Sequence, residues 1–303
     1  MPEIDCLVQN NMIIKYYLKP FLLAFVFTLL ITPVVIYLAK KFNFLDIPKD
    51  NRRMHNKPMP IGGGLGMYIV ISILSLYFLK LDRMLVMLLI GSTIIVVSGL
   101  IDDKKSLSPK MKLFFQVLAA VCLIIGGVKI EFFTNPFEAE QMLELINLLS
   151  IPITIFWVCG ITNTINLIDG LDGLAAGISM ICAISMFFIT RRINHIAVTF
   201  ICVLVAGACL GFLPYNFNPA KIFMGDTGAL YLGFMLSFIT IQGVMKQAAI
   251  LMMFVPLLAL GVPVFDTAFA MVRRKLHGKS IVEADKGHLH HRLLAKGLNQ
   301  KQT

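Results

Sequence analysis

Long apolar runs separated by short polar segments dominate the whole chain. Crossing a hydrocarbon core of about 30 Å takes roughly 20 apolar residues in a helix, because a spanning segment has to satisfy its own backbone polar groups. The segments that meet this requirement are 20–39, 61–79, 84–101, 111–128, 148–166, 174–190, 196–213, 229–245 and 248–272. The pattern therefore predicts an all-α, polytopic integral membrane bundle of about nine transmembrane helices.

Composition supports this prediction. Of the 303 residues, 57% are hydrophobic and 15% are charged, whereas an ordinary soluble domain has about 45–50% apolar and about 25% charged residues. A single soluble domain and a disordered chain are both excluded. The sequence contains no internal repeat and no linker, so we expect residues 1–303 to form one membrane domain. Five of the six cysteines lie inside apolar runs and are interpreted as small core residues.

The basic residues are distributed unequally between the two sides of the predicted bundle. The formal net charge of +10 would suggest nucleic acid on a soluble protein, but on a membrane chain it reports orientation. One set of span ends carries 19 lysines and arginines and the other set carries 8. This bias predicts that the N-terminus lies outside and the C-terminus lies in the cytoplasm. The first apolar run is long enough to span, so no cleaved signal peptide and no nucleic-acid partner are expected.

Unusual polar residues lie beside the predicted cytoplasmic ends of the spans. They follow the third span, surround the end of the fifth, precede the eighth and follow the ninth. They are Asp102 and Asp103; Asn163, Asn166, Asp169 and Asp172; Asp226; and His288, His290, His291 and Arg292. Four loops that are distant in the sequence are therefore predicted to converge at the cytoplasmic membrane surface.

The acidic and amide residues allow both a structural and a chemical interpretation. Asp102 and Asp103, taken alone, fit a pair of solvated acids, although beside a metal or phosphate one of them can serve as a base. Asn166, Asp169 and Asp172 recur every three residues on one side of a helical turn, which favours ligand binding over a simple turn. Asp226 lies in apolar sequence, where an unpaired carboxylate is costly, so we expect a cation as its partner.

Ligand type favours Mg²⁺ as that cation. Carboxylate and amide oxygens without cysteine suit a hard cation, and Mg²⁺ typically uses one or two carboxylates plus substrate phosphates. The segment 288–292 is too compact for a HExxH zinc site and, with five basic residues nearby, fits an anion clamp. A basic stop-transfer loop accounts for those lysines and arginines but not for the histidines. Gly62 to Gly64 fit a close helix contact or a turn, because no GKS or GKT follows them.

Together these residues predict a site that binds a polyanion with Mg²⁺ at the membrane boundary. A soluble pyrophosphate compound could reach the site from the cytoplasm, and a lipid phosphate could reach it from the leaflet. Phosphoryl transfer between the two would need mainly positioning and charge neutralisation. A membrane transporter is the alternative, although transporters place their sites near the bilayer midplane rather than at helix ends on one side.

Four motifs carry a family resemblance. They are the acid pair Asp102 and Asp103, the NxxNxxDGxDGL pattern from Asn163 to Leu174, FMGDTG from Phe223 to Gly228, and HLHHR from His288 to Arg292. In this order, within about residues 33–298, they resemble the polyprenyl-phosphate N-acetylhexosamine-1-phosphate transferases. The HxHH form is similar to the undecaprenyl-phosphate GlcNAc-1-phosphate transferase branch, which is related to the phospho-MurNAc-pentapeptide translocase with its three consecutive histidines.

The resemblance implies an activity. GlcNAc 1-phosphate would pass from UDP-GlcNAc to undecaprenyl phosphate, releasing UMP and initiating an envelope glycan such as teichoic acid or O-antigen. UDP-MurNAc-pentapeptide as donor is the alternative within the family. The enzyme would use Mg²⁺, or Mn²⁺ in its place, in the bacterial cytoplasmic membrane, with its active site facing the cytoplasm. A homodimer is compatible with the resemblance.

The resemblance also implies roles for individual residues. Asp226 and Asn166 would bind the metal, and Asp102 and Asp103 would deprotonate or orient the lipid phosphate. The residues expected to bind substrate are Lys57, Lys112, Asn163, Asp169, Asp172, His288, His290, His291 and Arg292. Two departures from the family are that Ser106 replaces the last acid of DDxxD and that the sequence ends at Thr303, where relatives continue through one or two further helices.

Overall fold

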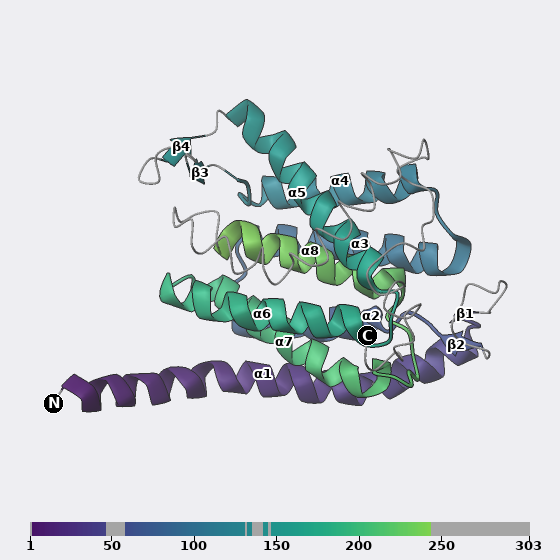
Figure 1. Ribbon diagram of the computed structural model, residues 1–303, viewed down its shortest axis with the longest axis horizontal. Helices are drawn as coiled ribbons and strands as arrows, with labels where there is room; N and C mark the ends of the chain where they lie inside the picture. Colours follow the sequence, from purple (N-terminus) through teal and green to yellow (C-terminus); the bar gives the residue numbers. More distant parts are fainter. Residues whose placement is uncertain (1, 47–57, 131, 135–141, 145–146, 244–303) are drawn as a thin grey trace, which may run out of the picture.

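The computed structural model describes residues 2–46, 58–130, 132–134, 142–144 and 147–243. Over these residues the chain is mostly helical and forms one bundle with two short pairs of strands (Figure 1). The elements are α1 (Pro2–Lys41), β1 (Leu45–Asp46), β2 (Met59–Pro60), α2 (Gly64–Phe78), α3 (Arg83–Lys105), α4 (Pro109–Ile125), β3 (Phe132–Thr134), β4 (Met142–Glu144), α5 (Asn147–Ile168), α6 (Leu174–Arg192), α7 (Ile196–Asn216) and α8 (Gly225–Gly243).

A helical, polytopic membrane protein is confirmed. Each of the first eight expected spans coincides with one helix, and the ninth, at 248–272, lies outside the described residues. Among the described helices, α1, α3, α5, α6 and α7 are long and apolar enough to cross a membrane, and α2 is a shorter apolar helix. The total of nine helices and the sides on which the termini lie stay predictions.

Helix α8 is the centre of the bundle. Every residue from Thr227 to Gly243 is buried, so the helix has no exposed face along this stretch. Its neighbours are α2, α3, α5, α6 and α7. A helix that is enclosed on all sides can carry polar residues such as Ser237 and Thr240, whose hydroxyl groups donate to backbone carbonyls of its own preceding turn.

Small residues bring the outer helices close together. A Cβ atom at Gly207 of α7 would lie 2.5 Å from the carbonyl oxygen of Phe21 in α1, and one at Gly211 would lie 2.4 Å from that of Phe25. Glycines four residues apart therefore form a flat strip on α7 against which the α1 backbone packs. This arrangement is typical of helix pairs in membranes.

Two strand pairs, which the sequence pattern did not predict, join helices at opposite ends of the bundle (Figure 1). At one end β1 pairs antiparallel with β2, which brings the end of α1 next to the start of α2. Pro60 of β2 accepts a hydrogen bond of 2.9 Å from the backbone N–H of Phe223, in the loop before α8. The α1–α2 connection is thereby attached to the segment that leads into the central helix.

Candidate active site

A cavity of about 670 Å³ lies where α3, α5 and α7 end and where α8 begins. Residues from four separate segments line it, and the sequence analysis had selected six of these lining residues. These are Asp102, Asp103, Asn166, Asp169, Asp172 and Asp226. The predicted convergence of the motifs around residues 102, 166–172 and 226 is thus confirmed, and it takes place at one end of the bundle.

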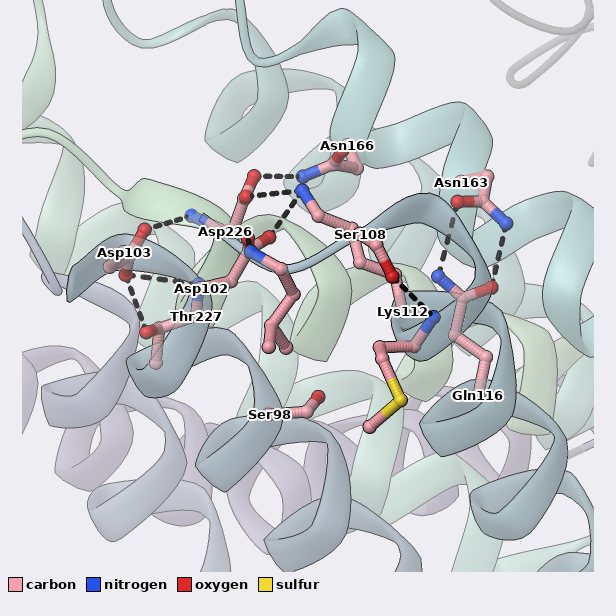
Figure 2. Close-up of polar contacts among 12 residues, drawn as sticks. Ser98, Asp102, Asp103, Ser108, Lys112, Gln116, Asn163, Asn166, Asp226 and Thr227 are labelled. Carbon is pink, nitrogen blue, oxygen red and sulfur yellow. Dashed lines mark hydrogen bonds and ion pairs between the residues drawn. The ribbon is translucent and has the colours of Figure 1, made fainter. Parts of the chain in front are cut away.

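Asp226 is the central acid of this cavity. It lies in the first turn of α8 and makes contacts with two other helices (Figure 2). One carboxylate oxygen, Oδ1, accepts a 2.6 Å hydrogen bond from Nδ2 of Asn166, at the end of α5. The other, Oδ2, accepts a 2.8 Å charge-assisted hydrogen bond from Nζ of Lys112, in the first turn of α4. Asp226, at the start of the central helix, is therefore held by side chains of α4 and α5.

Lys112 lies between two carboxylates. Its ammonium group forms ion pairs with Oδ2 of Asp226 and with Oδ2 of Asp102. The other oxygen of Asp102 accepts a 2.6 Å hydrogen bond from the backbone N–H of Leu107, in the turn between α3 and α4. The Asp102 side chain is only 5% exposed, and an acid buried to this degree needs a charged partner. Lys112 supplies that partner.

Asp103 turns away from this lysine. Its two carboxylate oxygens accept hydrogen bonds from the backbone of Asp226 and from the backbone and hydroxyl group of Thr227, all at the start of α8 (Figure 2). The two adjacent acids of the motif thus have different partners. The sequence, which shows only that they are neighbours, could not separate them.

Asn163 lies one turn before Asn166 on α5 and is paired with Gln116 of α4. The two amides exchange hydrogen bonds of 3.1 and 2.7 Å, and Nδ2 of Asn163 also donates to the carbonyl of Cys159. Gln116 is 1% exposed and lies one turn along α4 from Lys112. The pair joins α4 to α5 directly beneath the site, and the sequence analysis did not select Gln116, because a lone glutamine in an apolar helix carries no motif.

Asp169 lies among other acids in the loop between α5 and α6. Burial, and after it the negative charges of Asp226, Asp103 and Asp172, raise the pKa of the Asp169 carboxyl to about 8. In the absence of a cation this group is therefore largely protonated near neutral pH. Among the described residues, those that line the cavity include six aspartates, Asp46, Asp102, Asp103, Asp169, Asp172 and Asp226, and no lysine or arginine apart from the nearby Lys112.

Asp172 joins two loops. Its Oδ2 accepts hydrogen bonds of 3.0 Å from Nδ2 of Asn218 and of 3.2 Å from the backbone N–H of Ala220, in the loop between α7 and α8. Beside it, the buried Asn216 accepts from the backbone N–H of Gly173 and donates to the carbonyl of Ile222. The loop that follows α5 and the loop that precedes α8 are thereby held together at the edge of the cavity.

Several cavity residues were missed in the sequence. Asp46, Asn216 and Asn218 line it, and the signal that could have found the last two is a pair of asparagines in Tyr215-Asn216-Phe217-Asn218, just before FMGDTG. The other predicted substrate-binding residues lie outside the described residues. These are Lys57, His288, His290, His291 and Arg292.

The oxygen atoms of this cavity fit a magnesium ion whose remaining ligands would come from substrate. Within the described part of the chain, no three His, Cys, Asp or Glu side chains are arranged to hold a metal by themselves. Asp226 and Asp169 nevertheless line one cavity with Asn166, and their carboxylate oxygens, together with the amide oxygen of Asn166, are ligands of the kind that Mg²⁺ prefers. An ammonium group already lies between Asp226 and Asp102, so this position stabilises positive charge.

Comparison with known proteins identifies the family. The sequence profile described as Glycosyl transferase family 4 matches residues 85–244, which is more than half of the chain. A Bacillus subtilis (strain 168) protein named probable undecaprenyl-phosphate N-acetylglucosaminyl 1-phosphate transferase is 41% identical over 285 residues, covering 93% of this chain and 78% of the relative. The chain belongs to glycosyl transferase family 4. It is therefore an enzyme, a membrane-embedded transferase.

Other relatives of this family 4 transferase differ in the lipid or in the transferred sugar that their names state. A Mycolicibacterium smegmatis protein named decaprenyl-phosphate N-acetylglucosaminephosphotransferase is 35% identical, covering 93% of this chain and 76% of the relative. A Staphylococcus aureus (strain JH9) protein named phospho-N-acetylmuramoyl-pentapeptide-transferase is 31% identical, covering 90% of this chain and 89% of the relative. The names share transfer of a phosphorylated acetamido sugar, which agrees with the resemblance carried by the four motifs.

Proposed function

We propose that this enzyme transfers N-acetylglucosamine 1-phosphate from UDP-N-acetylglucosamine to undecaprenyl phosphate and releases UMP. The observation that carries the proposal is the single cavity in which the acids of α3, the α5–α6 loop and α8 meet. The Bacillus subtilis relative, at 41% identity, is named for this donor sugar and this lipid. The product would be the lipid-linked first sugar of an envelope glycan such as teichoic acid or O-antigen.

The proposed reaction is a direct displacement at phosphorus. A phosphate oxygen of the lipid attacks the β-phosphorus of the UDP-sugar, the bond from that phosphorus to the bridging oxygen breaks, and UMP leaves with the bridging oxygen. Little covalent chemistry is left for the protein, so catalysis depends on positioning and on neutralising charge. A cavity at the helix ends suits this task, because it is open to a soluble donor and adjacent to the bilayer.

In this proposal Lys112 and Asp102 receive the lipid phosphate. The ammonium group that now bridges Asp102 and Asp226 would contact the incoming phosphate. A carboxylate that loses part of its ion pair becomes a stronger proton acceptor, so Asp102 would take the proton from a monoprotonated phosphate. Lys112 therefore serves as both the charge partner of the free enzyme and the phosphate ligand of the complex.

Mg²⁺, or Mn²⁺ in its place, would be held by Asp226 with Asn166, and Asp169 lies within the same cavity. When bound, the ion would supply positive charge to the pyrophosphate oxygens of the donor. Asp226 would then exchange its lysine contact for the ion, and Asn166 would turn its amide oxygen toward it. Burial, and after it the negative charges of Asp226, Asp103 and Asp172, raise the pKa of Asp169, and this gathering of carboxylates supports a cation here.

The remaining predicted substrate ligands complete the proposal. Lys57 and the segment from His288 to Arg292 would bind the donor pyrophosphate or sugar, and they come from loops that the topology assigns to the same side as the cavity. That side would be the cytoplasmic face of the bacterial inner membrane, because it carries 19 of the 27 lysines and arginines.

The test is product identification with the purified, detergent-solubilised protein. Undecaprenyl phosphate, Mg²⁺ and a panel of UDP-sugars, including UDP-GlcNAc and UDP-MurNAc-pentapeptide, would be assayed for release of UMP and for the lipid product by mass spectrometry. We expect turnover with UDP-GlcNAc, and loss of at least about 10²-fold with Asp226→Ala, since a preorganised charge at the reacting phosphate is removed. Turnover only with UDP-MurNAc-pentapeptide would show that this compound, and not UDP-GlcNAc, is the donor. Unchanged activity of Asp226→Ala would refute the metal assignment.

A transporter is tested in the same preparation. Reconstituted vesicles loaded with UDP-GlcNAc would show counterflow of labelled UDP-GlcNAc if the cavity carried a substrate across the bilayer. We expect none, because the polar cluster lies at helix ends rather than on broken helices at the midplane. Counterflow without UMP release would refute the transferase proposal.

A further inference from the structure

We propose that Asp103 is a positioning residue, which fixes the metal-binding acid Asp226 by capping α8 from a neighbouring helix. The catalytic consequence of this cap rests on the proposed function. The cap itself rests on contacts that do not depend on the reaction.

Asp103 satisfies the free N–H groups at the start of α8. The first turn of any helix leaves backbone donors without partners, and a polar residue immediately before the helix normally accepts from them. Here that residue is the buried, apolar Met224, which offers no acceptor side chain. Asp103 accepts instead, at 2.7 Å from the backbone N–H of Asp226 and at 3.3 and 2.6 Å from the N–H and hydroxyl of Thr227.

The backbone at Gly225 is shaped around the Asp103 carboxylate. Gly225 has a φ of +72°, which disfavours residues with side chains. A Cβ atom at this position would lie 2.6 Å from Oδ2 of Asp103 and 2.8 Å from its Oδ1. The carboxylate therefore lies directly against the backbone turn that precedes Asp226.

Asp102 and Asp103 face different partners because of the helix geometry. Adjacent residues on an α-helix point about 100° apart, since there are 3.6 residues per turn. Asp102 is directed to the ammonium group of Lys112, which is the group placed to meet an incoming phosphate. Asp103 is directed to the backbone of α8. Among the described residues, Asp102 is the member of the pair that lies beside an ammonium group, and Asp103 is held by three hydrogen bonds that proton uptake would weaken.

The cap has a direct consequence for Asp226. The hydrogen bond to its own backbone N–H fixes the position from which its side chain reaches Asn166 and Lys112. A displacement of about 1 Å at a reacting centre can lower the rate about 10²-fold. Removing the cap should therefore reduce turnover without changing which group accepts the proton.

The experiment compares Asp103→Ala, Asp103→Asn, Thr227→Val and the double variant Asp103→Ala/Thr227→Val. Each full-length protein would be measured for kcat, for the Mg²⁺ concentration at half-maximal rate, for the pH profile of kcat/KM, and for thermal unfolding. We expect Asp103→Ala to lose about 10²-fold in kcat and to require more Mg²⁺, with the midpoints of the pH profile unchanged. Asp103→Asn keeps one acceptor oxygen and should recover part of the rate.

Coupling between the two residues distinguishes a cap from an acid that acts on substrate. Thr227→Val should lower kcat in the wild-type background and have a much smaller effect when Asp103 is already alanine, in both kcat and unfolding temperature. Additive effects on unfolding temperature, or a Thr227→Val protein with wild-type kcat, would overturn the cap. A shifted or missing acidic midpoint in Asp103→Asn, on the low-pH side where a required base becomes protonated, would identify Asp103 as the proton acceptor and would likewise overturn the proposal.

Asp82 provides a matched control on the same helix. It caps the other end of α3, where its Oδ1 accepts at 2.8 Å from the backbone N–H of Leu85. Asp82→Ala should lower the unfolding temperature and leave kcat and the Mg²⁺ requirement unchanged. If the wild-type protein releases no UMP from any donor, the proposed function fails, while the coupling measured by unfolding still decides whether Asp103 caps α8.

Discussion

Gly64 is the position where a single added methyl group should disable the enzyme. It is the first residue of α2, and its backbone packs directly on the backbone of α8 two residues beyond Asp226. A Cβ atom at Gly64 would lie 2.0 Å from Cα of Gly228 and 2.3 Å from its nitrogen. Ordinary van der Waals contact begins at 3.4 Å, so in Gly64→Ala the two helices would have to separate by about 1.4 Å.

The separation would also strain the hydrogen bonds that hold this contact. The backbone N–H groups of Gly63 and Gly64 donate to the carbonyls of Phe223 and Met224, at 3.1 and 3.2 Å. Overpacking of this kind typically costs about 1–3 kcal/mol of folding free energy. Because the displaced segment carries Asp226, a shift of about 1 Å should lower kcat about 10²-fold.

UMP release and thermal unfolding of Gly64→Ala in detergent measure both effects. The matched control is Gly160→Ala in α5, where an added Cβ meets no atom within 4 Å. Replacing a helical glycine by alanine without a clash should leave the unfolding temperature equal or higher, with wild-type turnover. Wild-type turnover and stability in Gly64→Ala would refute the argument that this glycine contact positions the start of α8.

Three further predictions concern the groups around the cavity. Gln116→Ala removes both hydrogen bonds to Asn163 and should cost about 1–2 kcal/mol of unfolding free energy; equal stability of the alanine variant and wild type in chemical unfolding would contradict this. Because the pKa of Asp169 is raised to about 8, its carboxyl binds a proton in the folded protein but not in the unfolded chain between about pH 4 and pH 8. In EDTA the unfolding temperature of the protein should therefore fall as the pH rises through this window, and it should fall less steeply in Asp169→Asn. Parallel plots of unfolding temperature against pH for the two proteins would show that Asp169 is not responsible. Asp172→Ala removes the acceptor for Asn218 and should raise KM for the UDP-sugar and accelerate proteolysis of the α7–α8 loop, whereas an unchanged cleavage rate would argue against a tie between the two loops.

Much of the fold could be predicted because a helix in lipid leaves a simple signal. Runs of about 20 apolar residues located the first eight helices to within a few residues, apart from α1, which begins at Pro2 rather than near Pro20. Pro20 and Pro33 lie inside α1, and proline is tolerated in a spanning helix because neighbouring groups and local adjustments satisfy the backbone groups that it frees. The strand pair β1 and β2 was missed, since two-residue strands carry no periodic pattern.

The candidate site was predictable as a set of residues but not as a set of contacts. Charge bias and motif position placed Asp102, Asp169 and Asp226 on one side, because a polar residue near the end of a span has only one membrane face to occupy. Which group each acid contacts depends on the rotation of one helix against another, and that rotation cannot be inferred from a single sequence. The pairing of Asn163 with Gln116 is the clearest example.

The enclosure of α8 separates the helix that carries Asp226 from the surrounding lipid. Bilayers of different thickness act on a protein through the helices that touch acyl chains, which tilt or shift to match their apolar length to the membrane. From Thr227 to Gly243 the central helix exposes no side chain on which such a force could act. Growth temperature and acyl-chain length would therefore tilt the peripheral helices while Asp226 kept its depth, and the rate of phosphosugar transfer should vary little among vesicles of different hydrophobic thickness.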